Sequence, residues 1–319
     1  MTVLRHVIES ISPASGAHAE GARQNVAAAE APLLTRLAGI LGGAQHTARP
    51  RTARRTIVVC AGDHGTGDPG IALGASHPTV VAAHAIADGT AALAHIARSS
   101  QAPILIVDAG ARESAAMPSS AIQLGRGPTL DLMTGPAMTV VDAALGLEAG
   151  IALAVSLADR GLDLLAIGAL GVGAEVSSAA LLGAALGAPP TGLGDAGAEA
   201  AGAHGAELAG SGAIEQLASL GGSETAVLAG LVLGAASMNI PTVLDGYATG
   251  AAALVAAAFA PAVSGYLIAA HVGAFTQPRI LAHLGLQPIF EVGLGHGEGT
   301  GAAMVLPLVD QVAALVARG

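Results

Sequence analysis

The stretch Thr56-Ile57-Val58-Val59-Cys60 runs directly into Ala61-Gly62-Asp63-His64-Gly65. The first five residues are mostly β-branched and apolar, which is typical of a buried strand. The next five combine glycines with an acidic residue and a histidine, and glycine lets a backbone turn sharply or approach a ligand closely. The two segments together predict a strand whose carboxyl end carries polar groups. In an open α/β sheet the ligand crevice lies at these ends.

The same pattern recurs along the chain. Further strands are predicted at 103–107, 163–167, 241–244 and 265–270, and each is followed by a glycine-bearing turn. Asp and Gly also favour ordinary turns, but five such strand ends at one topological position indicate a shared site. Alanine-rich stretches between the strands predict helices at 79–98, 147–162, 177–186, 223–237 and 250–259. We therefore expect an α/β fold, with a Rossmann-like parallel sheet flanked by helices.

The two ends of the chain lack this alternation and have helical patterns. Residues 1–50 and 285–319 are predicted to pack together as a small helical domain. Residues 51–284 are predicted to form a large α/β domain that carries most of the site.

Composition excludes several classes of function. The 319 residues contain no lysine, the formal net charge is −10, and the only basic cluster is Arg49, Arg51, Arg54 and Arg55. Nucleic-acid binding needs a contiguous positive surface, so it is not expected. The single Cys60 excludes an intramolecular disulfide and a multi-cysteine zinc site. His64, His77 and His84 lack the spacing of metal ligands, so we expect no metal and no cofactor.

A mean hydropathy of +0.63 makes a membrane protein the first alternative to consider. The apolar stretches 226–244 and 247–275 consist mainly of Ala, Gly and Val, and polar residues interrupt them. Aromatic belts and flanking cationic loops, which accompany membrane spans, are missing from the sequence. The first ten residues show no secretory pattern. We therefore predict a soluble, cytoplasmic protein that does not bind membranes.

Near the C-terminus, one carboxylate stands among glycines. The segment 293–301 contains Glu298 between Gly297 and Gly299, and an apolar helix is predicted over 302–317. The first N–H groups of such a helix point back toward Glu298. Glu298 could accept a proton from a bound substrate, or it could simply cap the helix.

Five segments, taken in order and spacing, resemble the nicotinate-nucleotide–dimethylbenzimidazole phosphoribosyltransferases of cobalamin lower-ligand assembly. They are 61–65, 135–139, 221–224, 244–256 and 297–302, and the resemblance covers nearly the whole chain. It implies a homodimer with a small-molecule nucleotide and an aromatic base as substrates, and it implies no metal. In the implied reaction a base nitrogen attacks the ribose C1′ of nicotinate mononucleotide, nicotinate leaves, and Glu298 is the general base.

Several positions depart from the family's pattern. The second active-site carboxylate of the family falls on Ala169, and polar positions beside the phosphate fall on Ala174, Glu175 and Val176. A Glu in the first turn of a helix repels a nearby phosphate. The family's lysine cannot be present, so Arg279 or His204 could replace it. Ser76-His77-Pro78 stands where the family often has Tyr-Pro-Gln, which leaves the acceptor base open.

The site prediction names Glu298 as the catalytic residue. Several predicted residues have a second interpretation. Asp63 and His64 could be turn or supporting residues, Gly171 and Gly173 could cradle a phosphate or only form a turn, and Glu224 and Asp245 could be close to ligand or cap helices. His271 and His296 are expected to lie in the core rather than on a phosphate. The predicted substrate-binding residues are Asp63, His64, Ser76, His77, Gly171, Gly173, Glu224, Asp245, Gly273 and Gly297.

We expect phosphoribosyl transfer from nicotinate mononucleotide, or a related nucleotide, to an aromatic lower-ligand base. The alternative is a non-catalytic or weakly active paralogue that binds a nucleotide or completes a heteromeric transferase with a homologue. Turnover that depends on Glu298 would distinguish the two.

Overall fold

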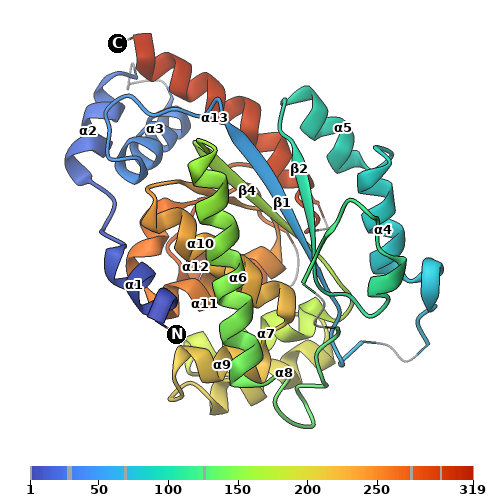
Figure 1. Ribbon diagram of the computed structural model, residues 1–319. Coiled ribbons are helices and arrows are strands. Elements are labelled where there is room, and N and C mark those ends of the chain that lie inside the picture. The colour runs from blue at the N-terminus through green and yellow to red at the C-terminus, as the bar shows by residue number, and fades with distance from the viewer. Residues whose placement is uncertain are drawn as a thin grey trace.

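The computed structural model describes residues 2–26, 31–67, 70–124, 127–273, 276–294 and 297–318. Its centre is a six-stranded, fully parallel sheet with the strand order β3-β2-β1-β4-β5-β6. Figure 1 shows the central strands β2, β1 and β4 side by side. The chain moves outward from β1 in one direction and from β4 in the other, so the order reverses between these two strands. The strands are β1 Arg55–Gly62, β2 Ile104–Gly110, β3 Ile122–Gln123, β4 Leu164–Leu170, β5 Thr242–Leu244 and β6 Leu267–Ala269.

Helices precede, connect and follow these strands. The N-terminal helices are α1 Thr2–Ser10, α2 Gly16–Gln24 and α3 Pro32–Ala44, and the C-terminal helix is α13 Thr300–Arg318. Between them lie α4 Pro78–Ala87, α5 Ala92–Ser99, α6 Val140–Asp159, α7 Ala174–Leu186, α8 Ala196–Glu207, α9 Ala213–Leu220, α10 Ser223–Ser237, α11 Tyr247–Phe259 and α12 Gln277–His283, with short 3₁₀ segments η1 Gly74–Ser76, η2 Ser114–Ala116 and η3 Pro261–Tyr266.

Both faces of the sheet are covered, and the side chains of β1 alternate between them. Val58 and Cys60 belong to the apolar cluster that includes residues of α6, α7, α10 and α11. Ile57, Val59 and Ala61 belong to the opposite cluster, which includes residues of α3, α4, α5 and α13. This alternation is the period of two that a strand imposes. A continuous apolar run such as 56–60 is expected for a strand buried on both faces.

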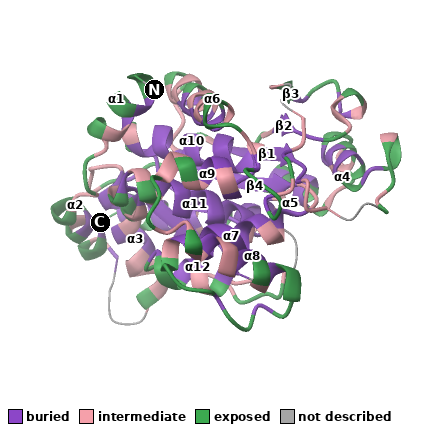
Figure 2. Cartoon of the chain, turned by 90° about the horizontal axis from the view of Figure 1, so that it is seen from below, coloured by how far each residue is buried: buried purple, intermediate pink, exposed green. Residues whose placement is uncertain are grey.

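Small residues let the central helices pack closely. A Cβ added at Gly230 of α10 would lie 2.1 Å from the Leu147 carbonyl oxygen of α6, and one at Gly150 would lie 2.0 Å from the Val227 carbonyl oxygen. Figure 2 shows α10 and α11 buried through most of their length, whereas α2, α6 and α8 carry many exposed residues. The high Gly and Ala content therefore serves close contact between helices.

The predicted parallel sheet is confirmed, and so are helices at both ends of the chain. The prediction of a single helix over 79–98 is wrong. The helix is interrupted between α4 and α5 at Gly89, which has a φ of +79°. The prediction also missed the two-residue edge strand β3 and the helices α8, α9 and α12.

Three helical segments in the described part of the chain have the length and composition to cross a membrane. They are the α4–α5 segment Pro78–Ser99, α6 and α13. In this fold α6 packs on α10, and α13 packs on α3, α5 and β4. Their apolar residues therefore also serve to cover the sheet.

Candidate active site

A small cavity opens at the carboxyl ends of the strands, beside β4. Its volume is about 160 Å³, and Glu298 supplies its carboxylate. Because β4 adjoins the point where the strand order reverses, this is the position where an open α/β sheet usually binds ligands. The lining residues are Pro78, Thr79, Ala82, Ala169, Leu170, Gly171, Val172, Tyr247, Gly297 and Glu298.

The backbone around Glu298 lies directly against β4. The Ala169 N–H donates to the Gly297 carbonyl at 2.8 Å. A Cβ at Gly168 would lie 2.5 Å from the Glu298 carbonyl, so only glycine allows this approach. Glu298 itself is half-buried. Ala169 also lines the cavity, so no carboxylate stands at the position where the family resemblance implied a second one.

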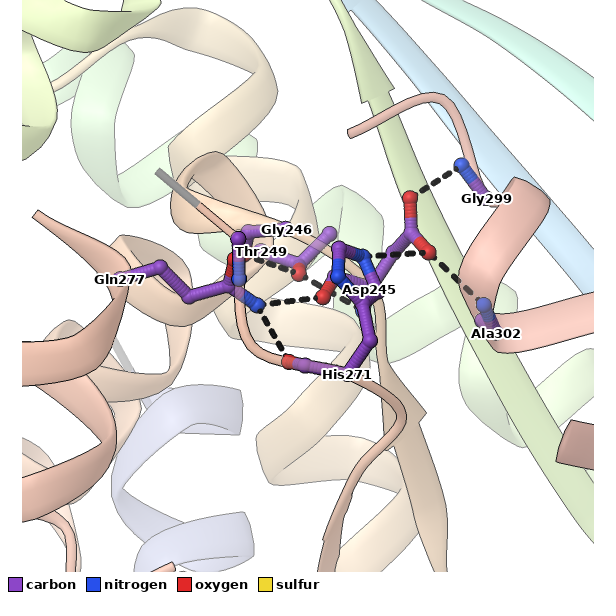
Figure 3. A network of polar contacts seen from close by, with 8 residues as sticks. Asp245, Gly246, Thr249, His271, Gln277, Gly299 and Ala302 are labelled. Carbon is purple, nitrogen blue, oxygen red and sulfur yellow. Dashed lines mark hydrogen bonds and ion pairs between the residues drawn. The ribbon is translucent and has the colours of Figure 1, made fainter. Parts of the chain in front are cut away.

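Asp245 follows β5 and caps helix α13 (Figure 3). Its Oδ2 accepts the Gly299 N–H at 2.8 Å, and its Oδ1 accepts the Ala302 N–H at 2.7 Å. The Asp245 side chain is fully buried. Of the two interpretations left open by the sequence, the geometry therefore favours helix capping. Glu298 was a candidate cap for helix α13, but Asp245 at the end of β5 caps that helix instead.

Asp63 joins three loops at the end of β1. Its carboxylate accepts hydrogen bonds from the Thr79 hydroxyl at 2.6 Å, the Arg112 N–H at 2.8 Å and the Val172 N–H at 3.0 Å. His77 Nδ1 lies 3.8 Å away. These partners come from the loops after β2 and β4 and from the start of α4. Asp63 therefore holds these three segments together at the end of β1.

His64 and Glu224 form a buried pair. His64 Nε2 lies 3.0 Å from Glu224 Oε1, both residues are 1% exposed, and Thr225 donates a further hydrogen bond to the same oxygen. Burial favours the neutral form of both groups, but their mutual charge and hydrogen bond outweigh it. The pKa of His64 is therefore raised, and the pKa of Glu224 is lowered. His64 Nδ1 and Glu224 Oε2 are buried without a hydrogen-bond partner in the described structure.

A second cavity, of about 350 Å³, lies next to the first, and Val172 lines both. Asp63, His64 and His77 contribute to its wall. His77 is the N-cap of α4 and accepts the Thr79 N–H through Nδ1. Ser76 is exposed on η1 and lines neither cavity. The structure thus brings three of these four predicted residues together.

The turn after β4 leads into α7. A Cβ at Gly171 would lie 1.8 Å from the Gly62 carbonyl oxygen, and Gly173, the N-cap of α7, has a φ of +87°. Gly173 has no side chain to cap the helix, so the first N–H groups of α7 are suited to an anion. Glu175 lies in the first turn and opposes one. Its charge and that of Glu224 add to the effect of burial, which raises the pKa of Tyr247 to about 12.

Gly273 and His271 lie after β6, on the far side of Asp245. The Gly273 N–H donates to Gln277 Oε1 at 2.8 Å, so Gly273 supports the network around Asp245. His271 is buried, as expected, with Nε2 3.5 Å from Asp245 Oδ1. Burial lowers the pKa of His271, but the nearby Asp245 carboxylate outweighs it and the pKa is raised; neither ring nitrogen has a hydrogen-bond partner within the described residues. His296 is outside the described residues.

The two cations considered as lysine replacements differ in their surroundings. His204 on α8 faces Glu207 at 3.7 Å, one helical turn away. Arg279 on α12 is half-buried close to Gly192. Among the described residues, Arg279 forms no ion pair with an acidic group. Across the described residues, no group of three His, Cys, Asp or Glu side chains could hold a metal ion.

Sequence reasoning missed several residues that shape the site. Thr79 donates a hydrogen bond to Asp63, and Gly168 allows the backbone of Glu298 to approach β4 closely. Gln277 donates a hydrogen bond to the backbone carbonyl of Asp245 at 2.7 Å. Gly168 follows the predicted strand 163–167 and lies inside the observed strand β4, where an internal glycine can signal close backbone approach. The other two carry no signal in a single sequence, because their partners are distant along the chain or belong to the backbone.

Three comparisons relate the chain to known proteins. A phosphoribosyltransferase family model matches residues 9–318. The nicotinate-nucleotide–dimethylbenzimidazole phosphoribosyltransferase of Roseiflexus sp. strain RS-1 is 35% identical, over 97% of this chain and 93% of that protein. The protein of that name from Desulforudis audaxviator is 33% identical, over 100% and 96%. The crystal structure of one from Thermus thermophilus has a TM-score of 0.83 at 29% identity and covers 95% of this chain and 96% of that one, which confirms the predicted Rossmann-like fold.

Proposed function

The chain belongs to the nicotinate-nucleotide–dimethylbenzimidazole phosphoribosyltransferase family and is a phosphoribosyltransferase of cobalamin lower-ligand synthesis, and we propose that its reaction takes place at Glu298. The donor is nicotinate mononucleotide or a related nucleotide, and the acceptor is an aromatic base. One nitrogen of the base forms a bond to the ribose C1′. The bond from C1′ to nicotinate breaks, and nicotinate leaves with the electron pair.

Glu298 takes the N–H proton of the attacking base. The observation that supports this role is the position of a half-buried carboxylate in a cavity at the carboxyl end of β4. A general base must lie within hydrogen-bond reach of the proton it removes. The negative charge of Glu298 also stabilises the positive charge that develops on the ribose as nicotinate departs.

The acceptor is a compact ring system. The cavity has a volume of about 160 Å³, which leaves room for one such group but not for a whole nucleotide. Its lining combines the apolar side chains of Pro78, Ala82, Ala169, Leu170 and Val172 with the polar groups of Thr79, Tyr247 and Glu298. Size therefore limits the acceptor more than polarity does, and the panel of bases in the assay below identifies it.

The phosphate of the donor binds at the start of α7. Backbone N–H groups at Gly171 and Gly173 supply the contacts, and the helix dipole adds to the attraction. Glu175 opposes this attraction, so Arg279 is proposed as the balancing cation.

A turnover assay tests the proposal. The pure chain is incubated with nicotinate mononucleotide and a panel of benzimidazoles, purines and phenols, and released nicotinate is measured. We expect Glu298→Gln to lower kcat by roughly 10²- to 10⁴-fold, the usual contribution of a general base. Glu9→Gln, at an exposed residue of α1, is the matched control and retains full activity. Full activity of Glu298→Gln would refute the assignment of the base.

The assembly and location of the enzyme are further parts of the proposal. We propose a cytoplasmic homodimer that does not bind membranes, and light scattering coupled to size-exclusion chromatography measures its mass directly. Turnover that appears only after a homologous chain is added would instead indicate a heteromer.

A further inference from the structure

The segment that carries Glu298 is attached on both sides. On its N-terminal side, the Gly297 carbonyl accepts the Ala169 N–H at 2.8 Å. On its C-terminal side, the Gly299 N–H donates to Asp245 Oδ2 at 2.8 Å. Glu298 is the single residue between these two attachments. Its backbone therefore has little freedom as long as both are made.

Asp245 makes the second attachment with both of its carboxylate oxygens. Oδ1 accepts the Ala302 N–H at 2.7 Å, so the carboxylate spans the Gly299 turn and the first turn of α13 (Figure 3). A negative charge at this position also interacts favourably with the helix dipole. A Cβ at Gly301 would lie 2.7 Å from Asp245 Oδ1, so this glycine lets the helix settle directly onto the carboxylate.

Asp245 is itself fixed from behind. Its N–H donates to Thr249 Oγ1 at 3.0 Å, and its carbonyl accepts from Gln277 Nε2 at 2.7 Å. The same Gln277 amide donates to the His271 carbonyl at 2.9 Å, which ties the end of β5 to the end of β6. The direction of the Asp245 carboxylate is thus set by two strand ends and two helices.

We propose that Asp245 is the positioning residue for Glu298, and that it aims this side chain into the cavity through the backbone of Gly299 and Ala302. The inference rests on the proposed role of Glu298. Asp245 is fully buried and is not among the residues that line the cavity, so it acts without touching substrate. The sheet, rather than the loop itself, determines where the general base stands.

A plain helix cap and a positioning residue predict different kinetics. A cap that only stabilises the fold lowers the melting temperature and leaves kcat of the folded enzyme unchanged. A positioning residue lowers kcat because a displacement of about 1 Å can cost on the order of 10²-fold in rate. Substituting a positioning residue no longer lowers kcat once Glu298 has been replaced, because the effects of substituting two residues that act as a unit are not additive.

The experiment is a double-mutant cycle measured on the folded full chain below its melting temperature. Asp245→Asn keeps one acceptor oxygen and loses the other, and we expect kcat to fall by roughly 10²-fold with KM for nicotinate mononucleotide within about threefold. Added to Glu298→Gln, the same substitution lowers kcat by less than about threefold. Hydrogen exchange should accelerate over residues 299–303 in the Asp245→Asn protein.

Asp163→Asn is the matched control. Asp163 also accepts a backbone N–H, from Arg54 at 2.9 Å, but at the opposite end of β4. It should lower stability without changing kcat. If Asp245→Asn does not fold, Thr249→Val removes the acceptor of the Asp245 N–H, and the same cycle is run with that variant at an expected loss of several-fold in kcat.

The outcomes separate this inference from the proposed function. Full activity of Glu298→Gln, or no turnover by the wild type, overturns both. An inactive Glu298→Gln beside a fully active Asp245→Asn overturns the positioning role alone. So does a cycle in which the Asp245 substitution reduces kcat equally in both backgrounds, because that effect does not pass through Glu298.

Discussion

At the scale of single residues, the carboxylates of the site differ in their surroundings: three are held by protein groups, and Glu298 lines the cavity beside β4. Asp63, Glu224 and Asp245 are each at most 2% exposed, and protein groups hold them. A buried charge is expensive unless it is paired and hydrogen-bonded; each of the three accepts hydrogen bonds from protein groups, although Oε2 of Glu224 has no partner in the described structure. Glu298 is half-buried and lines the cavity. This contrast is the physical reason to assign the chemistry to Glu298.

The His64–Glu224 pair predicts a dependence of stability on pH. The raised pKa of His64 means that its contribution is complete below the ordinary pKa of histidine, 6.5, and is lost as pH rises through the folded pKa. The lowered pKa of Glu224 means that its contribution is present above the ordinary value, 4.5, and is lost only as pH falls through the lower folded pKa. The pair therefore stabilises most between about pH 4.5 and 6.5.

Thermal unfolding of Glu224→Gln checks this prediction. Removing one partner of a buried pair costs about 3 kcal/mol, so the variant should be least stable relative to the wild type near pH 5.5. The difference should shrink as pH rises above the folded pKa of His64. Glu9→Gln controls for the loss of one negative charge. A difference that grows between pH 6.5 and 8.5 would contradict the assignment.

The sequence alone could indicate Glu298, because its glycine neighbours are local. It could not choose between a ligand-binding and a capping role for Asp245. The groups that decide this are the N–H groups of Gly299 and Ala302, which lie 54 and 57 residues further along the chain. The same holds for Glu224, whose partner His64 is 160 residues away. Roles that depend on such long-range contacts need the fold.

At the scale of secondary-structure elements, glycines set the distance between α6 and α10. We predict that Gly230→Ala lowers the free energy of unfolding by about 2 kcal/mol, because its Cβ would meet the Leu147 carbonyl oxygen at 2.1 Å and force the helices apart. Gly16→Ala, in α2, is the matched control, since a Cβ there has no atom within 4 Å. Chemical denaturation measures both. A Gly230→Ala protein as stable as the wild type would show that this contact is not tight.

Elements with strong local signals were predicted well, and weak ones were not. Helix α10 was predicted with its observed bounds, because its apolar run is long and Gly222 precedes it. The edge strand β3 has two exposed residues and no apolar run to reveal it. Helices α8 and α9 lie in an alanine- and glycine-rich region whose composition resembles a loop. Their packing against α7 supplies the order that composition does not.

At the scale of the whole molecule, α3 and α13 cover one face of the sheet, whereas α1 packs on α6 and α10 over the other face. Helix α3 contacts α13, and residues of both belong to the same apolar cluster as Ile57 and Val59 of β1. We predicted two units, a helical one of 1–50 with 285–319 and an α/β one of 51–284, and this division remains a prediction. It does not require two independent folding units, because an apolar face shared with the sheet couples their unfolding.

We expect the terminal helices and the sheet to unfold in one cooperative transition. Leu306→Ala, at a fully buried residue of α13, should cost about 3 kcal/mol and should reduce hydrogen-exchange protection equally in α13 and in α10, on the opposite face. Leu315→Ala, on the same helix but 40% exposed, should change little. If Leu306→Ala weakened protection in α13 while α10 kept its own, the terminal helices would be a separate unit, and the position of Glu298 would depend on that unit alone rather than on the whole fold.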